Sequence, residues 1–497
     1  MPQPKAVVIG SGVAGLAAAI RLSVMGYEAD VFERNAYAGG KLSAFEKDGF
    51  LFDAGPSLFT QPQNIEELFA FAGEPMDAYF QYRQVPLSCK YFYENGKQVQ
   101  AWTNAEQLAD ELHVQLGESK EAVLQYLSKS ETLYDNIGRI FLNHSLHKRS
   151  TWLQKPVLKA LQTVRAAHLT GTLHSFNQSS FKTTEAVQLF DRFATYNGSN
   201  PYQTPGMMSL IPHLELNEGT FYPTGGMISI TNALVKLAEK KAVRIHYNTP
   251  VQRIIHRAGE VKGVVVNNEN IEADIVVSNA DVYFTYQQLL GDSYQSKKVL
   301  KQERSCSGVI FYWGMNREFS NLHLHNIFFS KNYASEFTAL FRQQRLYNDP
   351  TVYVNITSKM EEGLAPKGME NWFLLINAPS NVGQNWEAMR VQLRQQVIEK
   401  LSRLLQTNIE EAIATEEYLD PIRIEERTGS YMGSLYGTSS NGKMAAFLRH
   451  PNFTKRIQGL YFCGGSVHPG GGIPLCFKSA KIATELIQQD YQQQRIH

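Results

Sequence analysis

The hydrophobic pattern is clearest in the first forty residues, where two short apolar runs flank an alanine-rich segment. Lys5–Ile9 is a compact run with β-branched residues, which is typical of a buried parallel strand. Residues 16–22 are strong helix formers without a breaker. Glu28–Phe32 follows as a second apolar run. The pattern therefore predicts a β-α-β unit at the start of the chain.

The turn between the first strand and the helix holds Gly10, Gly12, Ala14 and Gly15 in the spacing of a dinucleotide-binding fingerprint. Gly10 permits the tight turn, Gly12 lets the backbone approach a pyrophosphate, and Gly15 lets the helix pack close to the strand. Free N–H groups at the helix N-terminus favour phosphate. Glu33 closes the second strand, where a carboxylate accepts hydrogen bonds from ribose hydroxyls. Glycines alone also occur in ordinary turns, but here every part of the fingerprint is in register.

Arg34 follows directly, and a second glycine pair precedes Lys41, which allows another close backbone approach. Residues 33–41 resemble the segment that flavoproteins of the amine-oxidase and carotenoid-desaturase group place beside FAD. The resemblance implies that Arg34, Gly40 and Lys41 contact the cofactor. The family usually has Arg where Lys41 stands, so the charge is kept and the planar fork is lost. The alternative is a surface turn with a basic flank.

A glycine-dense turn at residues 459–474 is the second anchor, and it precedes an apolar helix. It closely resembles the C-terminal signature of the bacterial and fungal type of phytoene desaturase. With the turn at residues 53–57, the Asn279-Ala280-Asp281 segment and residues 433–437, the resemblance covers nearly the whole chain. It implies an FAD site that also includes Gly55, Pro56, Val251, Asn279, Gly464, Gly465, Gly472, Ile473 and Pro474, with the last three beside the flavin ring.

The nucleotide-binding pattern stops near residue 76 and returns twice, so we expect two interleaved domains rather than a string of separate ones. The expected class is α/β, with a Rossmann-like FAD-binding domain and an interleaved α+β substrate domain. The FAD-binding parts are residues 1–75, 223–290 and 455–497, and the substrate parts are residues 76–222 and 291–454. Within these, residues 42–52 and 423–426 are each predicted to form a strand.

Composition adds limits. The chain of 497 residues is 43% hydrophobic with a net charge of +1, so nothing global indicates nucleic acid. Four widely spaced cysteines fit neither a disulfide framework nor a metal site. No signal peptide precedes the first strand, and no run of about 18 apolar residues occurs, so we expect a cytoplasmic protein without a spanning helix. Nothing in the sequence indicates an oligomeric state.

Local charge is uneven, because residues 136–184 contain no Asp or Glu. Arg139, Lys148, Arg149, Lys155, Lys159, Arg165 and Lys182 make the stretch basic. Apolar residues at roughly helical spacing, with Trp152 among them, suit an anionic membrane surface. We therefore expect peripheral association with the inner face of the cell membrane. An ordinary helix with a solvated basic face explains the same pattern.

The resemblance implies removal of two hydrogens from a C–C single bond of a long carotenoid, with FAD as acceptor. Such chemistry needs positioning more than a nucleophilic triad. His468 is the candidate for proton transfer. His323 and His325 share one face of a strand but have no third ligand in sequence, so no metal is expected.

One stretch indicates the branch of the family. Residues 192–202 resemble the version found in hydroxycarotenoid 3,4-desaturases, and Tyr196, Asn197 and Asn200 are the candidate partners of a substrate hydroxyl. The alternatives are a phytoene desaturase, an FAD-dependent amine or sterol-type oxidase on the same fold, and a flavin-binding carrier without activity.

Overall fold

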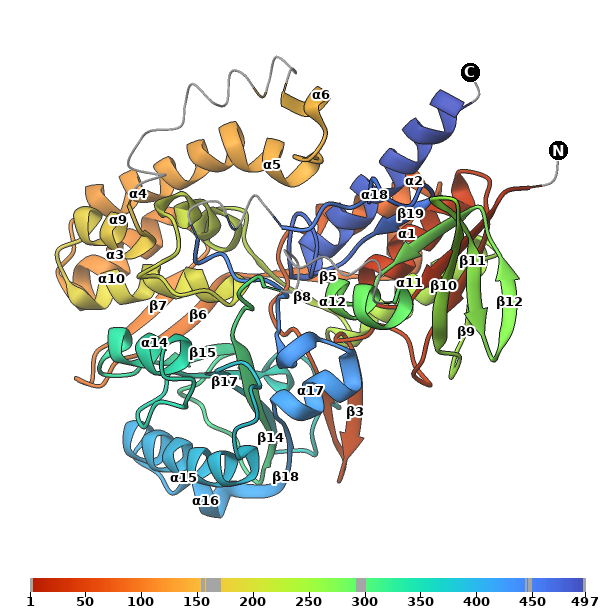
Figure 1. Cartoon of the computed structure of the whole chain (residues 1–497). Helices are drawn as coiled ribbons and strands as arrows, with labels where there is room; N and C mark the ends of the chain where they lie inside the picture. Colours follow the sequence, from red (N-terminus) through yellow and green to blue (C-terminus); the bar gives the residue numbers. More distant parts are fainter. Residues whose placement is uncertain are drawn as a thin grey trace.

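A computed structural model describes residues 3–152, 157, 171–291, 301–442, 445 and 449–494. A parallel sheet with its helices and a larger mixed sheet form the two halves of the molecule (Figure 1). Lys155, Lys159 and Arg165 of the basic stretch lie outside the described residues. Among the described residues, no helix combines the length and apolarity needed to cross a membrane.

The parallel sheet is assembled from three distant parts of the chain, in the order β19-β13-β1-β2-β9. Its strands are β1 (Lys5–Ile9), β2 (Glu28–Phe32), β9 (Arg244–His246), β13 (Ile275–Ser278) and β19 (Leu460–Phe462). All four neighbouring pairs are parallel, with Val8 opposite Val31 and Val277. The carboxyl ends of β1, β2 and β13 therefore lie at one edge.

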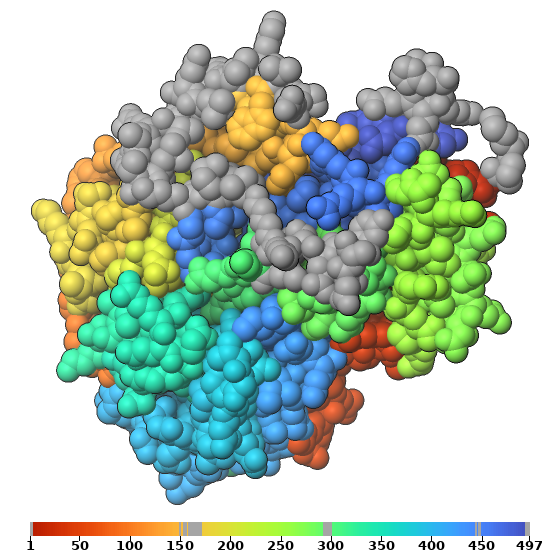
Figure 2. Space-filling model, in the orientation of Figure 1, coloured from red at the N-terminus to blue at the C-terminus, as the bar shows by residue number. Residues whose placement is uncertain are grey.

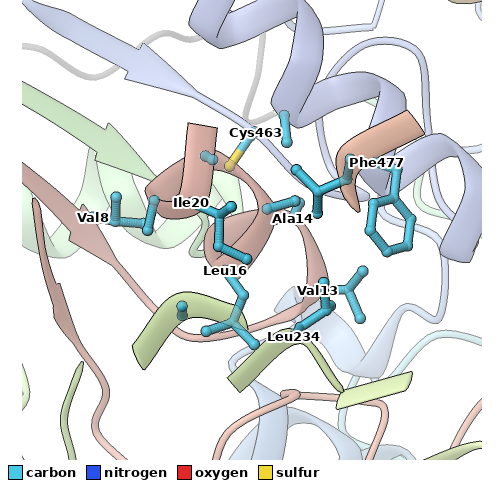
Figure 3. Close-up of a cluster of buried hydrophobic side chains, with 14 of the residues drawn as sticks. Val8, Val13, Ala14, Leu16, Ile20, Leu234, Cys463 and Phe477 are labelled. Atoms are coloured by element: carbon cyan, nitrogen blue, oxygen red, sulfur yellow. The ribbon is translucent and has the colours of Figure 1, made fainter. Parts of the chain in front are cut away.

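Both faces of the parallel sheet are covered, which explains its continuous apolar strands. On one face pack α1 (Val13–Val24), α11 (Ile228–Lys240) and α18 (Ile473–Gln494). Figure 3 shows this cluster, in which Ile20 of α1 lies near Val8, Leu16 lies near Leu234, and Phe477 of α18 lies near Ala14. The other face carries the three-stranded meander β10 (Val251–Arg257), β11 (Glu260–Val266) and β12 (Glu269–Glu272).

The mixed sheet has seven strands in the order β18-β14-β17-β16-β15-β6-β7. These are β6 (Leu87–Phe92), β7 (Gln98–Trp102), β14 (Ser307–Met315), β15 (His325–Phe328), β16 (Val352–Ile356), β17 (Glu370–Ala378) and β18 (Ile413–Leu419). Only its β15–β6 pair is parallel among the described strands. Trp313 and Trp372 are fully buried with residues of α15 (Trp386–Leu405).

Helices from residues 105–191 pack near the β6–β7 edge of this sheet (Figure 1). They are α3 (Ala105–Leu116), α4 (Lys120–Leu133), α9 (Leu173–Ser180) and α10 (Thr184–Asp191). After α4 the chain continues as a π-helical turn, Tyr134–Gly138, and α5 (Arg139–Asn143), which contacts α18. Lys478 of α18 donates a hydrogen bond to Asn143 Oδ1 at 2.7 Å, and the orange and dark blue surfaces meet in Figure 2.

The remaining elements are shorter and connect these layers. They are β3 (Ala44–Lys47), β4 (Phe50–Asp53), α2 (Gln63–Phe71), β5 (Tyr82–Val85), α6 (Arg149–Trp152), β8 (Thr220–Pro223), α12 (Val282–Phe284), α14 (Tyr333–Phe341), α16 (Ile409–Ala412) and α17 (Pro421–Thr428), with several single 3₁₀ or π turns. Of the turns, those at Arg192–Asn197 and His213–Asn217 bring side chains to the site.

Two predicted strands are corrected. Residues 42–52 form the β3–β4 hairpin instead of one strand, because Asp48 and Gly49 take positive φ values of 51° and 81° and reverse the chain. The strand predicted at residues 423–426 is helix α17. Asp420 caps that helix by accepting a hydrogen bond from Arg423 N at 2.9 Å, and Pro421 occupies its first turn, a start signal that was present in the sequence.

A candidate cofactor and substrate cavity

A cavity of about 560 Å³ lies between the two sheets. On one side it is lined by the loops that follow β1, β2 and β13 and by the glycine turn before α18. On the other side it is lined by side chains of the mixed sheet, including Ile310, Ile327, Phe373 and Leu375. Its polar end is thus formed by backbone-rich loops at strand termini, and its other end by a sheet face.

The first glycine loop is held by a second one. Gly10 has a φ of +93°, which an L side chain rarely adopts. Gly12 pairs with Gly39 in an isolated parallel bridge, and Gly39 N donates to Ser11 O at 2.9 Å. A Cβ on Gly15 would lie 2.1 Å from Gly10 O, so Gly15 serves helix–strand packing. Gly12 precedes α1 with no side-chain cap, so the first N–H groups of that helix have no side-chain acceptor at Gly12.

Glu33 is the charged group beside this loop, and its side chain is 5% exposed. One carboxylate oxygen accepts hydrogen bonds from Ser11 N and Ser11 Oγ, both at 2.8 Å. The other accepts one from Asn35 N at 2.8 Å. Glu33 also lines the cavity, and these three hydrogen bonds fix the orientation of its carboxylate before any ligand binds. Ser11 and Asn35 were not identified from the sequence.

Lys41 lines the cavity, but its ammonium group contacts protein carbonyls. Nζ donates to Leu435 O at 2.6 Å and to Ser434 O at 3.1 Å. Burial lowers the pKa of Lys41 to about 8, despite the nearby charge of Asp281. Arg34 likewise donates to Glu426 O, at 2.6 Å. Lys41 therefore ties the cavity wall to the segment after α17, and Arg34 ties it to α17 itself.

The Asp53–Ser57 turn divides into a structural part and a cavity part. Asp53 accepts hydrogen bonds from Met227 N at 2.9 Å and Ile228 N at 3.1 Å, so it caps α11. Burial raises the pKa of Asp53 to about 6, although these amide bonds oppose the rise. A Cβ on Gly55 would lie 1.7 Å from Lys41 O, which only glycine avoids. Gly55, Pro56 and Ser57 line the cavity.

A buried charged pair faces the cavity from the substrate side. Arg192 Nη2 donates to both carboxylate oxygens of Glu215, at 2.9 and 3.0 Å. Ser88 Oγ donates to the same carboxylate at 2.8 Å, and the Tyr196 hydroxyl also donates to it. The Arg192 guanidinium lies 4.3 Å from the centre of the Phe193 ring. The carboxylate of Glu215 therefore neutralises the charge of Arg192 in the buried wall of the cavity.

Most residues predicted to hold a cofactor come together around this cavity. Those that line it are Gly10, Gly12, Ala14, Glu33, Arg34, Gly40, Lys41, Gly55, Pro56, Val251, Asn279, Gly465, Gly472, Ile473 and Pro474, together with Tyr196 from the substrate group. Gly15 and Gly464 lie behind the wall, and a Cβ on Gly464 would be 2.6 Å from Asn279 Oδ1.

Three predicted site residues, His468, Asn197 and Asn200, are not among the residues that line this cavity. His468 Nε2 donates to His144 O at 2.9 Å, and burial lowers the pKa of His468 to about 4. Asn197 Nδ2 donates to Ser440 Oγ at 3.2 Å. Asn200 Oδ1 accepts from Tyr202 N at 2.9 Å, so it stabilises its own turn. Each of the three side chains thus makes a hydrogen bond within the protein.

Sequence reasoning missed the polar residues of the mixed sheet. His325 and Tyr353 line the cavity, and a hydrogen bond of 2.7 Å joins His325 Nδ1 and the Tyr353 hydroxyl. His325 was considered only as a metal ligand, and among the described residues no cluster suited to a metal ion occurs. Arg192 opens the stretch that indicated the branch of the family, whereas nothing in the sequence pointed to Glu215.

Comparison with known proteins agrees with this geometry. Residues 13–298 match the family described as flavin containing amine oxidoreductase. The chain is 48% identical over 97% of its length to a 1-hydroxycarotenoid 3,4-desaturase from Flavobacterium sp. (strain P99-3), of which it covers 99%. It is 32% identical over 98% of its length to a 4,4'-diapolycopene oxygenase from Methylomonas sp, of which it covers 99%.

Among solved structures, an oxidoreductase from Methanosarcina mazei superposes with a TM-score of 0.65 at 16% identity. The likeness covers 97% of this chain and all of that one. At this identity it shows the fold, and the α/β class predicted from the sequence is confirmed.

Proposed function

The chain belongs to the carotenoid desaturase and oxygenase family of flavin-containing amine oxidoreductases, and from that premise we propose that it is an FAD-dependent 1-hydroxycarotenoid 3,4-desaturase. It is an oxidoreductase that desaturates a carotenoid. The observation that carries the finer assignment is the likeness to the Flavobacterium desaturase through nearly the full length of both chains. We also propose the domain bounds given above, at residues 75, 222, 290 and 454, because the strands of the parallel sheet lie in the FAD-binding parts and those of the mixed sheet in the substrate parts.

The residues present fit FAD. The glycine loops leave backbone exposed where a pyrophosphate must approach, and Glu33 holds a fixed carboxylate at the end of β2 for the ribose hydroxyls. The cofactor would be held by the loops after β1, β2 and β13 and by the turn before α18, with Gly472, Ile473 and Pro474 toward its ring. When bound, FAD supplies a two-electron acceptor.

The reaction removes a hydride, which the bound cofactor would accept, from one carbon and a proton, which would be released to solvent, from its neighbour, so that the C3–C4 single bond becomes a double bond. The mixed sheet provides apolar contact for a polyene through Ile310, Ile327 and Leu375, and these side chains exclude water from the reacting bond. Orientation is the main contribution of the protein, because two carbons must be held against one acceptor.

Comparison of two carotenoid substrates tests the assignment. Purified flavoprotein is incubated separately with phytoene and with a 1-hydroxylated linear carotene, and products are separated and their absorption recorded. We expect a red shift for the hydroxylated compound, because the polyene lengthens. Conversion of phytoene alone would identify a phytoene desaturase. Bleaching of the flavin by an amine but by neither carotenoid would indicate an amine oxidase. If none of these compounds reacts, the protein is a flavin-binding carrier without activity.

We also propose that the protein associates peripherally with the inner face of the cell membrane, where a long apolar substrate resides. The support is the basic stretch at residues 136–184 and the Trp152 side chain, which is 37% exposed. Lys148 does not add a free charge, since it pairs with Asp490 at 3.1 Å. The charges of Lys155 and Lys159 are therefore the ones to test.

A further inference from the structure

Helix α17 belongs to the substrate domain, yet its last turn is bound to the segment that follows β2. Arg34 Nη2 donates to Glu426 O at 2.6 Å. Asn35 Nδ2 donates to Arg427 O at 3.2 Å. The backbone amide of Asn35 also donates to Glu33 Oε1, at 2.8 Å. The end of α17 therefore stands beside the carboxylate that the proposed function assigns to the ribose hydroxyls.

Arg427, in that last turn, lines the cavity with a partly buried side chain. The nearby charge of Arg427 opposes the rise that burial causes in the pKa of the Tyr312 hydroxyl. That hydroxyl donates to Ala54 O at 3.2 Å, and the next residue, Gly55, lines the cavity as well. The Arg427 side chain therefore lies in the part of the wall between the end of β2 and the Gly55 turn.

The charge of Arg427 is available to a ligand, unlike the other positive charges of the wall. Among the described residues, the lysine and arginine side chains that line the cavity are Arg34, Lys41, Arg192 and Arg427. Arg34 and Lys41 donate to protein carbonyls. Arg192 is neutralised by Glu215. The side chain of Arg427 has neither a hydrogen bond nor an ion pair with any residue in the described part of the chain.

The chemistry of the two ligands selects between them, and this step rests on the proposed function. A carotenoid has no anionic group, whereas the pyrophosphate of FAD carries two negative charges. With the ribose at Glu33, the pyrophosphate extends from the end of β2 toward the glycine loops. A guanidinium suits that group, because its planar donors match phosphate oxygens in pairs and its charge compensates for the water that the anion loses.

We infer that Arg427 binds the pyrophosphate of FAD, so that the substrate domain contributes a ligand to the cofactor. Arg34 and Asn35 act through it as positioning residues, because they hold the carbonyl oxygens of the last turn of α17 and so determine where Arg427 stands. FAD bound in this way joins the two domains.

The test compares Arg427→Met, which removes the charge, with Arg427→Lys, which keeps it. Apoprotein is titrated with FAD and with riboflavin, which has the same ring system but no phosphate. Arg427→Met should bind FAD roughly 10- to 100-fold more weakly and riboflavin equally well, and Arg427→Lys should lose less of the FAD affinity. The matched control is Arg423→Met on the same helix. Arg423 donates to Glu417 at 2.9 Å and is not among the residues that line the cavity, so both ligands should bind to this variant as they do to the unaltered protein. An unchanged dissociation constant for FAD in Arg427→Met, or equal weakening of both ligands, overturns the inference.

Phosphorus NMR of the flavin-loaded protein decides the case in which Arg427→Met does not fold or riboflavin binds too weakly to measure. The ³¹P signals of bound FAD should shift in Arg427→Lys, because an ammonium group replaces the planar guanidinium, and should stay in place in Arg423→Met. Unmoved signals in Arg427→Lys overturn the inference. If the unaltered apoprotein itself does not bind FAD, the proposed cofactor fails instead, so the two failures are distinguishable.

Discussion

The carboxylate of Glu33 is joined to Ser11 by two hydrogen bonds of 2.8 Å, one from the backbone amide and one from the hydroxyl. The two residues follow the carboxyl ends of the neighbouring parallel strands β1 and β2 and are 22 positions apart in sequence. The contact fixes the first glycine loop against the end of β2. It also orients the carboxylate in advance, which lowers the ordering cost of binding a ribose.

The Ser11 hydroxyl is therefore predicted to support cofactor affinity. Ser11→Ala removes one of the two bonds and keeps the amide bond, so FAD affinity should fall about 5-fold, the equivalent of roughly 1 kcal/mol. Ser128→Ala, at an exposed position of α4, is the matched control. Titration of apoprotein with FAD by fluorescence quenching measures both. An unchanged dissociation constant for Ser11→Ala would contradict the preorganised arrangement.

Gly12 should tolerate no branched side chain while FAD is bound. Its φ of −63° is accessible to any residue, so backbone strain is not the obstacle. A Cβ there would lie 2.7 Å from Asn279 Nδ2 and would narrow the cavity wall. Purified Gly12→Val should be colourless, with far-ultraviolet circular dichroism retained, and Gly12→Ala should hold an intermediate amount of flavin. Stoichiometric flavin in Gly12→Val would refute this interpretation of the loop.

The parallel sheet was predictable because its signals are local. Lys5–Ile9, the glycines and Glu28–Phe32 each carry their own pattern within one β-α-β unit. The Asp48-Gly49 turn and the Asp420-Pro421 helix start were equally local, but a stronger apolar pattern hid them. Tertiary pairings have no such signal.

The substrate side of the cavity shows which features could not be predicted from the sequence. Arg192 and Glu215 are 23 positions apart and meet through two short helical turns, which no periodicity reports. Asn197 and Asn200 are polar residues beside Tyr196, yet the turn directs them to Ser440 and to their own backbone. The family resemblance drew attention to residues 192–202, but only packing decided which of their side chains reach the cavity.

His468 is predicted to act in structure and not in proton transfer. Its Nε2 donates to a backbone oxygen of His144, and the residue is absent from the cavity wall. His468→Gln keeps a donor and should hold kcat/KM within about 2-fold, whereas His468→Leu leaves a buried carbonyl unpaired and should lower the free energy of unfolding by roughly 1–3 kcal/mol. Both variants should keep the pH–rate profile of the unaltered enzyme. If either variant loses one limb of the pH–rate profile, His468 does take part in proton transfer.

Acid should destabilise the protein through buried neutral histidines. Burial lowers the pKa of His325 to about 3 and those of His450 and His468 to about 4. The unfolded chain binds these protons near pH 6.5, so between pH 6.5 and 4 it carries more protons than the native state. The free energy of unfolding therefore rises with pH over this window and falls on acidification, by up to about 1.4 kcal/mol per pH unit for each histidine.

The contribution of a single site is measurable. The free energy of unfolding is measured by urea denaturation at several pH values between 6.5 and 4.5. In His325→Gln its slope against pH should be smaller by about 1.4 kcal/mol per pH unit, which corresponds to one proton. Above pH 7 the two slopes should coincide, since His325 is neutral in both native and unfolded states there. Identical slopes across the acidic window would show that His325 titrates normally in the folded protein.

Charge reversal at Lys155 and Lys159 should release the protein from anionic membranes. Each basic residue near such a surface contributes about 1 kcal/mol, and the attraction is screened within roughly 10 Å at 0.1 M salt. Lys148 is left unaltered, because Glu at that position would face Asp490 and disturb an existing ion pair. The double change to Glu should reduce co-sedimentation with vesicles containing phosphatidylglycerol at least 10-fold, and 0.5 M salt should do the same to the unaltered protein.

The control is the double variant Lys236→Glu with Lys240→Glu, which alters the net charge equally at exposed positions of α11 and should bind as the unaltered protein does. If the α11 variant is released as well, net charge rather than the basic stretch governs binding. If neither variant is released, the stretch is a solvated face, and the substrate reaches the cavity without electrostatic docking.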